Sequence, residues 1–361
     1  MSDAPRTIGV TGLNATDNPA PGVAVLRSLR QAFGPKTRLV ALAYDVLDPG
    51  LYSDELGLHA AYLLPWPSQG VDALRERLRH VQAETGLDVL IPTLDSELPA
   101  MIELAPELAR AGIRTFLPTR EQFELRSKAR LAELGRKAGL EVPLQRPISS
   151  VEELYKLHEE VPFPLMVKGV FYGAELARNV DEARHIFHRT VAQWGLPVIA
   201  QQFHAGEEYD VVAVGDGEGG LVGAVPMKKL MLTDKGKGWA GVAVRDPKLL
   251  EMTAAFMKAT RWRGPCEVEV LRTHEGAYYL LEVNPRFPAW CHLAAGAGMN
   301  LPAAVVRLAA GERVDPRSDY RAGTMFVRIS LDQITTLDRF EALATAGELA
   351  PHGDDHDAAQ V

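Results

Sequence analysis

The sequence is poor in cysteine, in long apolar runs and in positive charge. Its two cysteines, Cys266 and Cys291, cannot build a disulfide framework or a thiolate zinc site, and each is expected as a small buried side chain. No apolar run approaches the ~20 residues that span a bilayer, and the N-terminus has no basic segment followed by an apolar one. A net charge of -8 lacks the basic footprint of nucleic-acid binding. We therefore expect a soluble, cytoplasmic protein that binds neither nucleic acid nor membrane.

Several motifs that mark enzymes are also missing. The turn at residues 11–22 lacks the G-x-G-x-x-G spacing of a dinucleotide-binding loop, and no Walker A sequence occurs in the chain. No Ser/His/Asp or Cys/His arrangement offers a side-chain nucleophile. An anionic ligand is still compatible with the acidic balance, because a local cluster of Lys and Arg can bind it.

Residues 1–118 alternate short apolar runs with helical patterns. Strands are predicted at 7–12, 38–44, 88–93 and 113–118, and helices at 22–33, 71–86 and 97–112. One strand per ~25–40 residues, each followed by a helix, is typical of a doubly wound parallel sheet. We predict an α/β, Rossmann-like domain over residues 1–118.

The pattern changes after residue 118. Residues 123–143 predict one charged helix, and two hairpins follow at 201–227 and 265–285, each with glycine at its turn. An α+β domain with antiparallel sheet is therefore expected over 119–310. Its expected parts are a small lid subdomain with the linker helix at 119–195 and a hinge and metal-site subdomain at 196–310. A charged C-terminal extension with a frayed end is expected to follow at 311–361.

The second hairpin places acidic side chains next to one another. Glu269 and Glu282 lie on its two strands with the turn between them, so both carboxylates can point to one face. Asn284 lies two residues beyond Glu282 and faces the same way. These oxygens would repel one another without a cation, and hard oxygen ligands suit Mg²⁺. We assign a metal site to Glu269, Glu282 and Asn284, with Glu267 as the alternative to Glu269 on the same face.

The end of this hairpin carries a resemblance to a known family. Glu282-Val283-Asn284-Pro285-Arg286 matches the E-x-N-P-R segment that closes the metal site of the ATP-grasp superfamily, and Glu269 matches the other metal ligand. The chain is identified as a member of that superfamily of carboxylate–amine ligases, over roughly residues 7–310. The resemblance implies that Arg286 faces the transferring phosphoryl group, a role that suits a permanently charged, bidentate guanidinium. The alternative is a solvated hairpin face with alternating acids.

The resemblance also implies a nucleotide site. Lys168, at the end of the apolar run 163–169, is similar to the phosphate-binding lysine of the family. Lys128 resembles an earlier lysine that precedes a helix ending in Gly-x-x-x-Pro, here Gly139 to Pro143. Without the family resemblance, Lys128 would be interpreted as an ordinary solvated lysine.

The adenine and ribose contacts are implied by the segment 198–214. Gln201, with the backbone of Gln202 and His204, would meet the adenine edge, and Glu208 would bind the ribose hydroxyls. The other reading of Glu208 is a surface charge.

Two Lys- or Gly-containing segments would cover the phosphates. Lys229, within a Lys- and Gly-rich stretch that would suit a mobile loop, would reach them, although the alternation leaves Lys228 nearly as good. The family's Gly/Ser-rich loop is replaced here by residues 169–179, with one interior glycine, Gly173. Phe171 and Tyr172 would then cover the phosphates, or the loop is shorter.

The N-terminal domain resembles the pre-ATP-grasp domain of the carbamoyl-phosphate-synthetase-like branch. The matching segments are TGLNATDNPAPGVAVLRSLR and DVLIPTLDSELPAMIEL. In that branch the domain helps to bind the acceptor. Asp95 and Glu97 follow a predicted strand, where they either bind an amine or, as we favour, cap the next helix.

The implied activity is an ADP-forming ligase that uses ATP with Mg²⁺, or Mn²⁺ in its place. A small-molecule or peptide carboxylate would be activated as an acyl phosphate and coupled to an amine. Residues 285–302 would line the acyl side through Phe287, Trp290 and His292, although Trp290 could as easily be a core residue. A homodimer is compatible with the family.

Two other functions stay open at this point. One is a carboxylase or kinase that acts on bicarbonate or another small acceptor with a partner, since the chain has no biotin-carrier lysine motif and no glutaminase triad. The other is a non-catalytic nucleotide-binding regulator, which the intact metal ligands and Arg286 disfavour.

Overall fold

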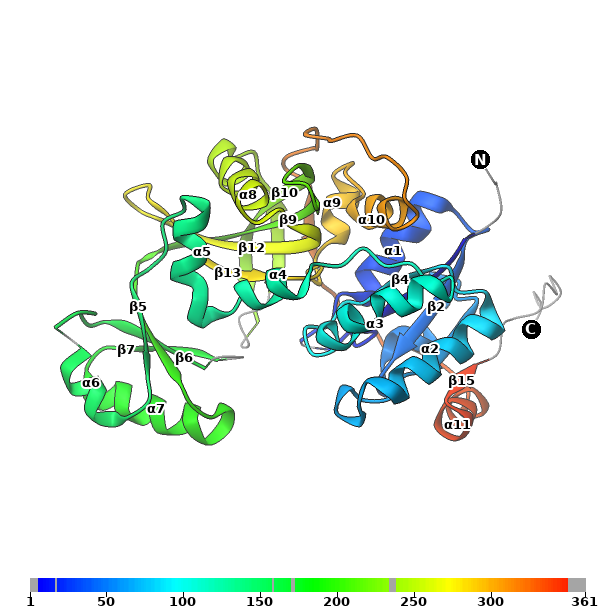
Figure 1. Ribbon diagram of the computed structural model, residues 1–361, viewed down its shortest axis with the longest axis horizontal. Helices are drawn as coiled ribbons and strands as arrows, with labels where there is room; N and C mark the ends of the chain where they lie inside the picture. Colours follow the sequence, from blue (N-terminus) through cyan, green and yellow to red (C-terminus); the bar gives the residue numbers. More distant parts are fainter. Residues whose placement is uncertain (1–5, 17, 158, 170–172, 234–237, 350–361) are drawn as a thin grey trace.

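The computed structural model describes residues 6–349 except 17, 158, 170–172 and 234–237. It contains three β-sheets, of five, six and four strands. In Figure 1 the six-stranded sheet lies between the N-terminal unit and a small unit built on the four-stranded sheet. No helix in the described part of the chain combines the length and the apolar character needed to cross a membrane.

The five-stranded sheet is built mainly from parallel neighbours. Its order is β15-β3-β2-β1-β4, in which the strands β1 to β4 run parallel to their neighbours. Their bounds are Thr7–Thr11, Arg38–Ala43, Ala60–Leu63 and Val89–Ile91. The helices α1, α2 and α3 cover it, with bounds Gly22–Phe33, Val71–Thr85 and Leu98–Arg110. Alternate residues of β2 pack on α1 and on α2 with α3, which gives the sheet a core on each face.

Two strand predictions in this unit were wrong. The apolar run at 113–118 forms only an isolated bridge, Val89 to Arg114, instead of a strand. The strand β3 was not predicted, because it is a four-residue run between short 3₁₀ helices at Pro49–Tyr52, Asp54–Leu56 and Pro67–Gln69. Short buried strands leave little periodicity in the sequence.

The linker that leaves this unit is not one helix. It forms α4 (Arg120–Leu125), a 3₁₀ turn (Lys128–Arg130) and α5 (Leu131–Ala138). The prediction of a single helix over 123–143 was therefore wrong. The break lies at Ser127, whose backbone is extended, and α5 ends at Gly139 in the left-handed conformation.

The four-stranded sheet is antiparallel and has the order β5-β8-β6-β7. The bounds are Gln145–Ile148, Val198–Gln202, Leu165–Gly169 and Ala174–Ala177. One face packs on α6 (Val151–Leu157) and α7 (Val180–Trp194). Since β8 belongs to this sheet, the segment 201–227 is not one hairpin from its first residue, and the next strand begins only at Gly206.

The six-stranded sheet contains both predicted hairpins. Its order is β13-β12-β9-β10-β11-β14, with antiparallel neighbours throughout. The bounds of β9 to β14 are Gly206–Asp216, Leu221–Leu232, Gly238–Ala243, Arg263–Thr273, Tyr278–Asn284 and Met325–Val327. On one face it packs against α5 and α8 (Pro247–Thr260). The antiparallel pairing that the sequence predicted for this region is confirmed.

The helices α9 (His292–Gly296) and α10 (Leu301–Ala309) join the two larger sheets. They pack on α1, and their buried side chains share one core with both sheets. Cys266 and Cys291 are buried, as predicted. The chain then returns to the first sheet through α11 (Leu337–Ala346) and β15 (Glu348–Leu349), which pairs antiparallel with β3. The predicted frayed end, 352–361, lies outside the described residues.

Candidate functional site

The polar site occupies one end of one face of the six-stranded sheet. On β9, Tyr209, Val211 and Ala213 enter the core with α5 and α8, while Val212 and Val214 face α9 and α10. Glu208 and Asp210 continue the second row beyond the apolar residues. The alternation therefore builds an acidic surface at the end of a face that is otherwise apolar.

The strand register brings four acidic positions together. Glu269 on β12 lies opposite Asp210 on β9 and opposite Glu282 on β13. Glu267, two residues earlier, lies opposite Asn284. Carboxylate oxygens of Asp210, Glu267 and Glu269 come within 4.8 Å of one another. Asp210 was missed from the sequence, although its position two residues after Glu208 places it on the same face.

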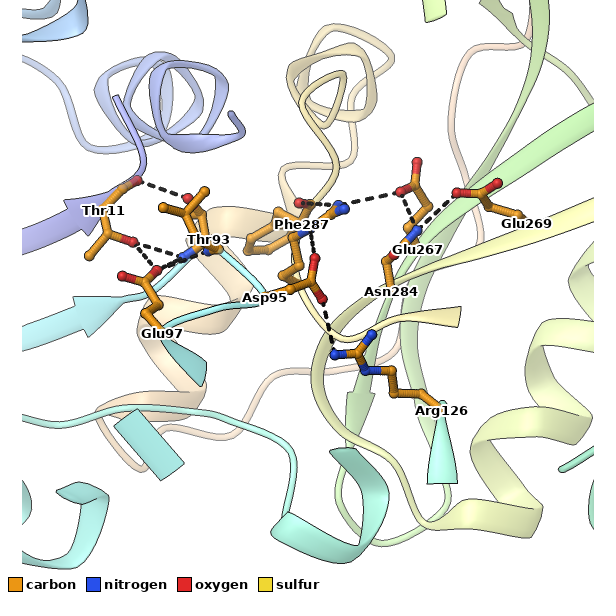
Figure 2. Close-up of polar contacts among 11 residues, drawn as sticks. Thr11, Thr93, Asp95, Glu97, Arg126, Glu267, Glu269, Asn284 and Phe287 are labelled. Atoms are coloured by element: carbon orange, nitrogen blue, oxygen red, sulfur yellow. Dashed lines mark hydrogen bonds and ion pairs between the residues drawn. The ribbon is translucent and has the colours of Figure 1, made fainter. Parts of the chain in front are cut away.

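Both carboxylate oxygens of Glu267 already accept hydrogen bonds. Trp290 Nε1 donates to Oε1 at 2.7 Å, and Asn284 Nδ2 donates to Oε2 at 3.1 Å. Arg286 Nη1 lies 3.4 Å from the same Oε2. Asn284 Nδ2 also donates to Glu269 Oε1 at 2.9 Å (Figure 2). Lys229 Nζ lies 3.8 Å from Glu269 Oε2. Glu267 therefore braces Trp290 and Arg286.

Burial disfavours the ionised form of these carboxylates more than the nearby lysines favour it. Burial raises the pKa of Asp210, against the opposing charge of Lys229 and with the help of Glu269. Burial also raises the pKa of Glu282, against Lys128 and with Glu269 adding to the effect. Crowded carboxylates that resist ionisation are the chemistry that a divalent cation relieves, so the donor set fits Mg²⁺. As a ligand, Asn284 would present Oδ1, the other end of the amide that now donates.

Lysines from three elements surround the acidic group. Lys128 Nζ lies 3.5 Å from Glu282 Oε2. Lys229 Nζ lies 2.9 Å from Glu208 Oε2 and 3.2 Å from Asp210 Oδ1, with its side chain only 9% exposed. Lys228 is on the opposite face, where it pairs with Glu207 at 2.6 Å. The strand register thus places Lys229, and not Lys228, beside the acidic group.

Lys168 approaches from the four-stranded sheet. Leu165 and Val167 of β6 enter the core with α6 and α7, so Met166 and Lys168 occupy the other face. Burial and then the charge of Lys128 lower the pKa of Lys168, while Glu282, Glu269 and Glu208 act in the opposite direction. The charges that act on Lys168 belong to the six-stranded sheet and the linker, so the lysine faces the acidic group.

The residues predicted to meet adenine lie where β8 leads into β9. Gln201 is 3% exposed, and its Nε2 donates to Gln145 Oε1 at 3.2 Å. The N–H of Gln202 donates to Leu144 O at 2.7 Å, so a contact with adenine is left to its carbonyl. The ring of His204 stacks on Tyr279 with centroids 4.1 Å apart. Of the predicted loop over the phosphates, Phe171 and Tyr172 lie outside the described residues.

The prediction that residues 285–302 line the acyl side through three ring side chains was wrong. Phe287 and Trp290 are 0% and 5% exposed and belong to the core shared by the two larger sheets. His292 Nδ1 lies 3.0 Å from Ser28 Oγ on α1. These side chains therefore brace α9 and do not line an open acyl pocket.

The favoured helix-capping role of Glu97 was also wrong. Glu97 makes no side-chain hydrogen bond to the start of α3. Its fully buried carboxylate instead accepts hydrogen bonds from the N–H groups of Thr93 and Leu94 and from the hydroxyls of Thr11 and Tyr44. Burial raises the pKa of Glu97. Asp95 turns toward the acidic site, where its Oδ2 lies 3.1 Å from Arg286 Nε.

Comparison with known proteins agrees with this geometry. Residues 196–330 match the model of a family described as ATP-grasp in the biosynthetic pathway with Ter operon. The chain is 28% identical over 199 residues to the carbamoyl phosphate synthase large chain of Clostridium botulinum, which covers 51% of this chain and 18% of that protein. The resemblance to the ATP-grasp superfamily that the sequence indicated is confirmed by these matches.

Solved ATP-grasp structures match over most of the chain. The biotin carboxylase domain of the 2-oxoglutarate carboxylase of Hydrogenobacter thermophilus, in complex with MgADP, ADP and bicarbonate, has a TM-score of 0.69 at 18% identity. The match covers 90% of this chain and 74% of that one. The L-amino acid ligase of Bacillus licheniformis has a TM-score of 0.63 at 16% identity, over 87% and 78% of the two chains. At these identities the likeness shows the fold.

The curated relatives are longer than this chain. The ATP-grasp chain spans 18% of the Clostridium relative, and it spans 43% of the N-terminal section of the carbamoyl phosphate synthase large chain of Methanopyrus kandleri at 23% identity. The activity and substrates of those whole proteins are thus not carried over with the sequence match.

Proposed function

We propose that this ATP-grasp chain is an ADP-forming ligase that activates a carboxylate as an acyl phosphate and couples it to an amine. The observation that carries the proposal is the acidic group of the six-stranded sheet, ringed by Lys128, Lys168 and Lys229 from three elements. Carboxylates for a divalent cation and lysines for phosphates are both needed to bind a metal–nucleotide complex.

The metal would be held by Glu269 and Glu282, with Asp210 beside them and Asn284 offering its amide oxygen. These residues would hold Mg²⁺, or Mn²⁺ in its place, which would supply positive charge against the charge that develops on the phosphates. Glu267 is left to hold Arg286 and Trp290 in place.

The chain's own residues would bind and orient ATP. Lys128 and Lys168 would exchange their present carboxylate surroundings for phosphate oxygens, and Lys229 would hold Glu208 toward the ribose hydroxyls. Gln201, the carbonyl of Gln202 and the backbone of His204 would border adenine. The cleft between the two sheets would exclude water, which otherwise hydrolyses an acyl phosphate.

Arg286 would act on both chemical steps. In the first step a carboxylate oxygen attacks the γ-phosphorus of ATP, and ADP leaves with the bond electrons. In the second step the amine attacks the acyl carbon, and phosphate leaves with the oxygen that the carboxylate contributed. The guanidinium would neutralise the phosphoryl oxygens first and the tetrahedral oxyanion next.

Bicarbonate is the second candidate for the activated acid. The similarity to a biotin carboxylase domain bound to MgADP and bicarbonate favours it. The acyl phosphate would then be carboxyphosphate, and the acceptor would come from a partner. The same cleft and the same Arg286 would serve this reaction.

The test is ADP release with Mg-ATP and a panel of carboxylates that includes bicarbonate, with hydroxylamine as a generic amine. We expect ADP release and hydroxamate formation to depend on one class of acid, and to be lost in Glu282→Gln. Glu207→Gln is the matched control, because Glu207 lies on the opposite face of β9 and should leave turnover unchanged. Tight ATP binding without ADP release for any acid would contradict the proposal and favour a regulator.

A further inference from the structure

The loop after β4 is fixed in place by its own buried carboxylate. The Glu97 carboxylate accepts hydrogen bonds from the N–H groups of Thr93 and Leu94 at 2.8 and 2.9 Å, and from the hydroxyl of Thr11. Thr93 Oγ1 donates to Thr11 O at 2.9 Å, which ties the loop to β1 (Figure 2). A loop held by this many buried hydrogen bonds presents its next side chain, Asp95, in one orientation.

Asp95 faces two arginines from other parts of the chain. Its Oδ2 lies 3.1 Å from Arg286 Nε, and its Oδ1 lies 3.6 Å from Arg126 Nη2 at the end of α4. The side chains of Asp95, Arg126 and Arg286 are 20%, 22% and 12% exposed. Figure 2 shows Asp95 between the Thr11–Glu97 network and the acidic group. One carboxylate of the N-terminal unit therefore contacts both the linker and the site.

Arg286 is held at two of its nitrogens. Nε pairs with Asp95, and Nη1 contacts Glu267 Oε2 at 3.4 Å and Phe287 O at 3.2 Å. Among the described residues, Nη2 receives no hydrogen-bond partner. The planar guanidinium is thus fixed by an acid on each side, and one edge is left for an oxygen of a ligand.

We propose that Asp95 is a positioning residue for Arg286, so that the five-stranded sheet orients the guanidinium that stabilises the acyl phosphate and the tetrahedral intermediate. This inference rests on the proposed function. It differs from both roles considered for Asp95 from the sequence, which were to cap the next helix and to bind an amine. We expect its effect to fall on the chemical steps, because the Asp95 carboxylate pairs with Arg286, the residue proposed to act in both of them.

The experiment compares Asp95→Asn with Asp88→Asn. Asp88 precedes the other end of β4 and pairs with Arg114 at 3.0 Å, so it is a matched acid–arginine pair away from the site. We expect kcat to fall about 10²-fold in Asp95→Asn, as a displacement of about 1 Å in a catalytic group does, with the KM for ATP nearly unchanged. Asp88→Asn should keep the wild-type kcat, and Asp95→Glu should recover part of the loss.

A second readout does not depend on turnover. In protein labelled with ¹⁵N at arginine, the Nε–H of Arg286, assigned with Arg286→Lys, should exchange slowly because Asp95 accepts it. The signal should weaken or shift in Asp95→Asn and persist in Asp88→Asn.

The outcomes separate the two proposals. A wild-type protein that releases no ADP with any acid contradicts the proposed ligase, while the Nε–H signal still decides the placement of Arg286. An active wild type with an unchanged kcat, or an unchanged Arg286 signal, in Asp95→Asn overturns the positioning role.

Discussion

At the scale of single residues, the strand alternation decides which of two adjacent charges belongs to the site. Lys228 and Lys229 are neighbours, yet only Lys229 contacts Glu208 and Asp210, because successive side chains of β10 point to opposite faces. The sequence could predict Glu269 and Glu282 as a pair from one hairpin. It could not show Asp210, because that residue joins the group only through the pairing of β9 with β12.

Lys229 should be needed for stability in the absence of metal. Its removal leaves buried carboxylates without their counter-ion, so we expect Lys229→Met to lower the free energy of unfolding by about 3–5 kcal/mol in EDTA. Mg²⁺ should restore part of that loss. Lys228→Met, on the opposite face where the lysine pairs with Glu207, should change it by about 0.5 kcal/mol or less. Urea unfolding of both variants with and without Mg²⁺ measures this, and equal losses would contradict the assignment.

Lys168 should make ATP use fall at alkaline pH. Burial and Lys128 lower the pKa of Lys168 below its ordinary value of 10.5, so the side chain loses its charge at a lower pH than a solvated lysine. The free enzyme should therefore lose kcat/KM for ATP as pH rises through that lowered pKa. Lys168→Arg should move this alkaline decline to higher pH, because guanidinium stays charged. A profile unchanged by the substitution would assign the decline to another group.

At the scale of elements, local patterns predicted the hairpins and failed where tertiary contacts decide. The hairpin of β12 and β13 has its turn where the glycine indicated it. The linker instead breaks at Ser127, and β15 is a two-residue strand that exists only because β3 offers a free edge. The placement of β8 in the four-stranded sheet was likewise not predicted, because local patterns do not say which sheet a strand joins.

The return of the C-terminal segment to the first sheet should stabilise that sheet. Leu343 on α11 is fully buried in the core shared by the larger sheets, while Leu337 on the same helix is 67% exposed. Leu343→Ala should lower the free energy of unfolding by about 2–5 kcal/mol. Leu337→Ala should change it by about 0.5 kcal/mol or less. Chemical denaturation measures both, and a small effect of Leu343→Ala would show that α11 is not part of the folded core.

At the scale of the whole molecule, the site lies where residues of all three sheets meet. The six-stranded sheet supplies the acidic group, the four-stranded sheet supplies Lys168, and the five-stranded sheet supplies Asp95 beside Arg286. The sequence could predict the first two by family resemblance. The third contribution required the structure, because Asp95 and Arg286 lie 191 positions apart.

The central claim is that ATP phosphorylates a carboxylate, and the fate of oxygen tests it most directly. A carboxylate found active in the panel would be labelled with ¹⁸O and turned over with Mg-ATP and its amine. An acyl phosphate predicts one ¹⁸O atom transferred to inorganic phosphate per turnover, because phosphate leaves with the oxygen that attacked phosphorus. Unlabelled phosphate, with the ¹⁸O that the acid loses found in AMP or in water instead, would contradict the account.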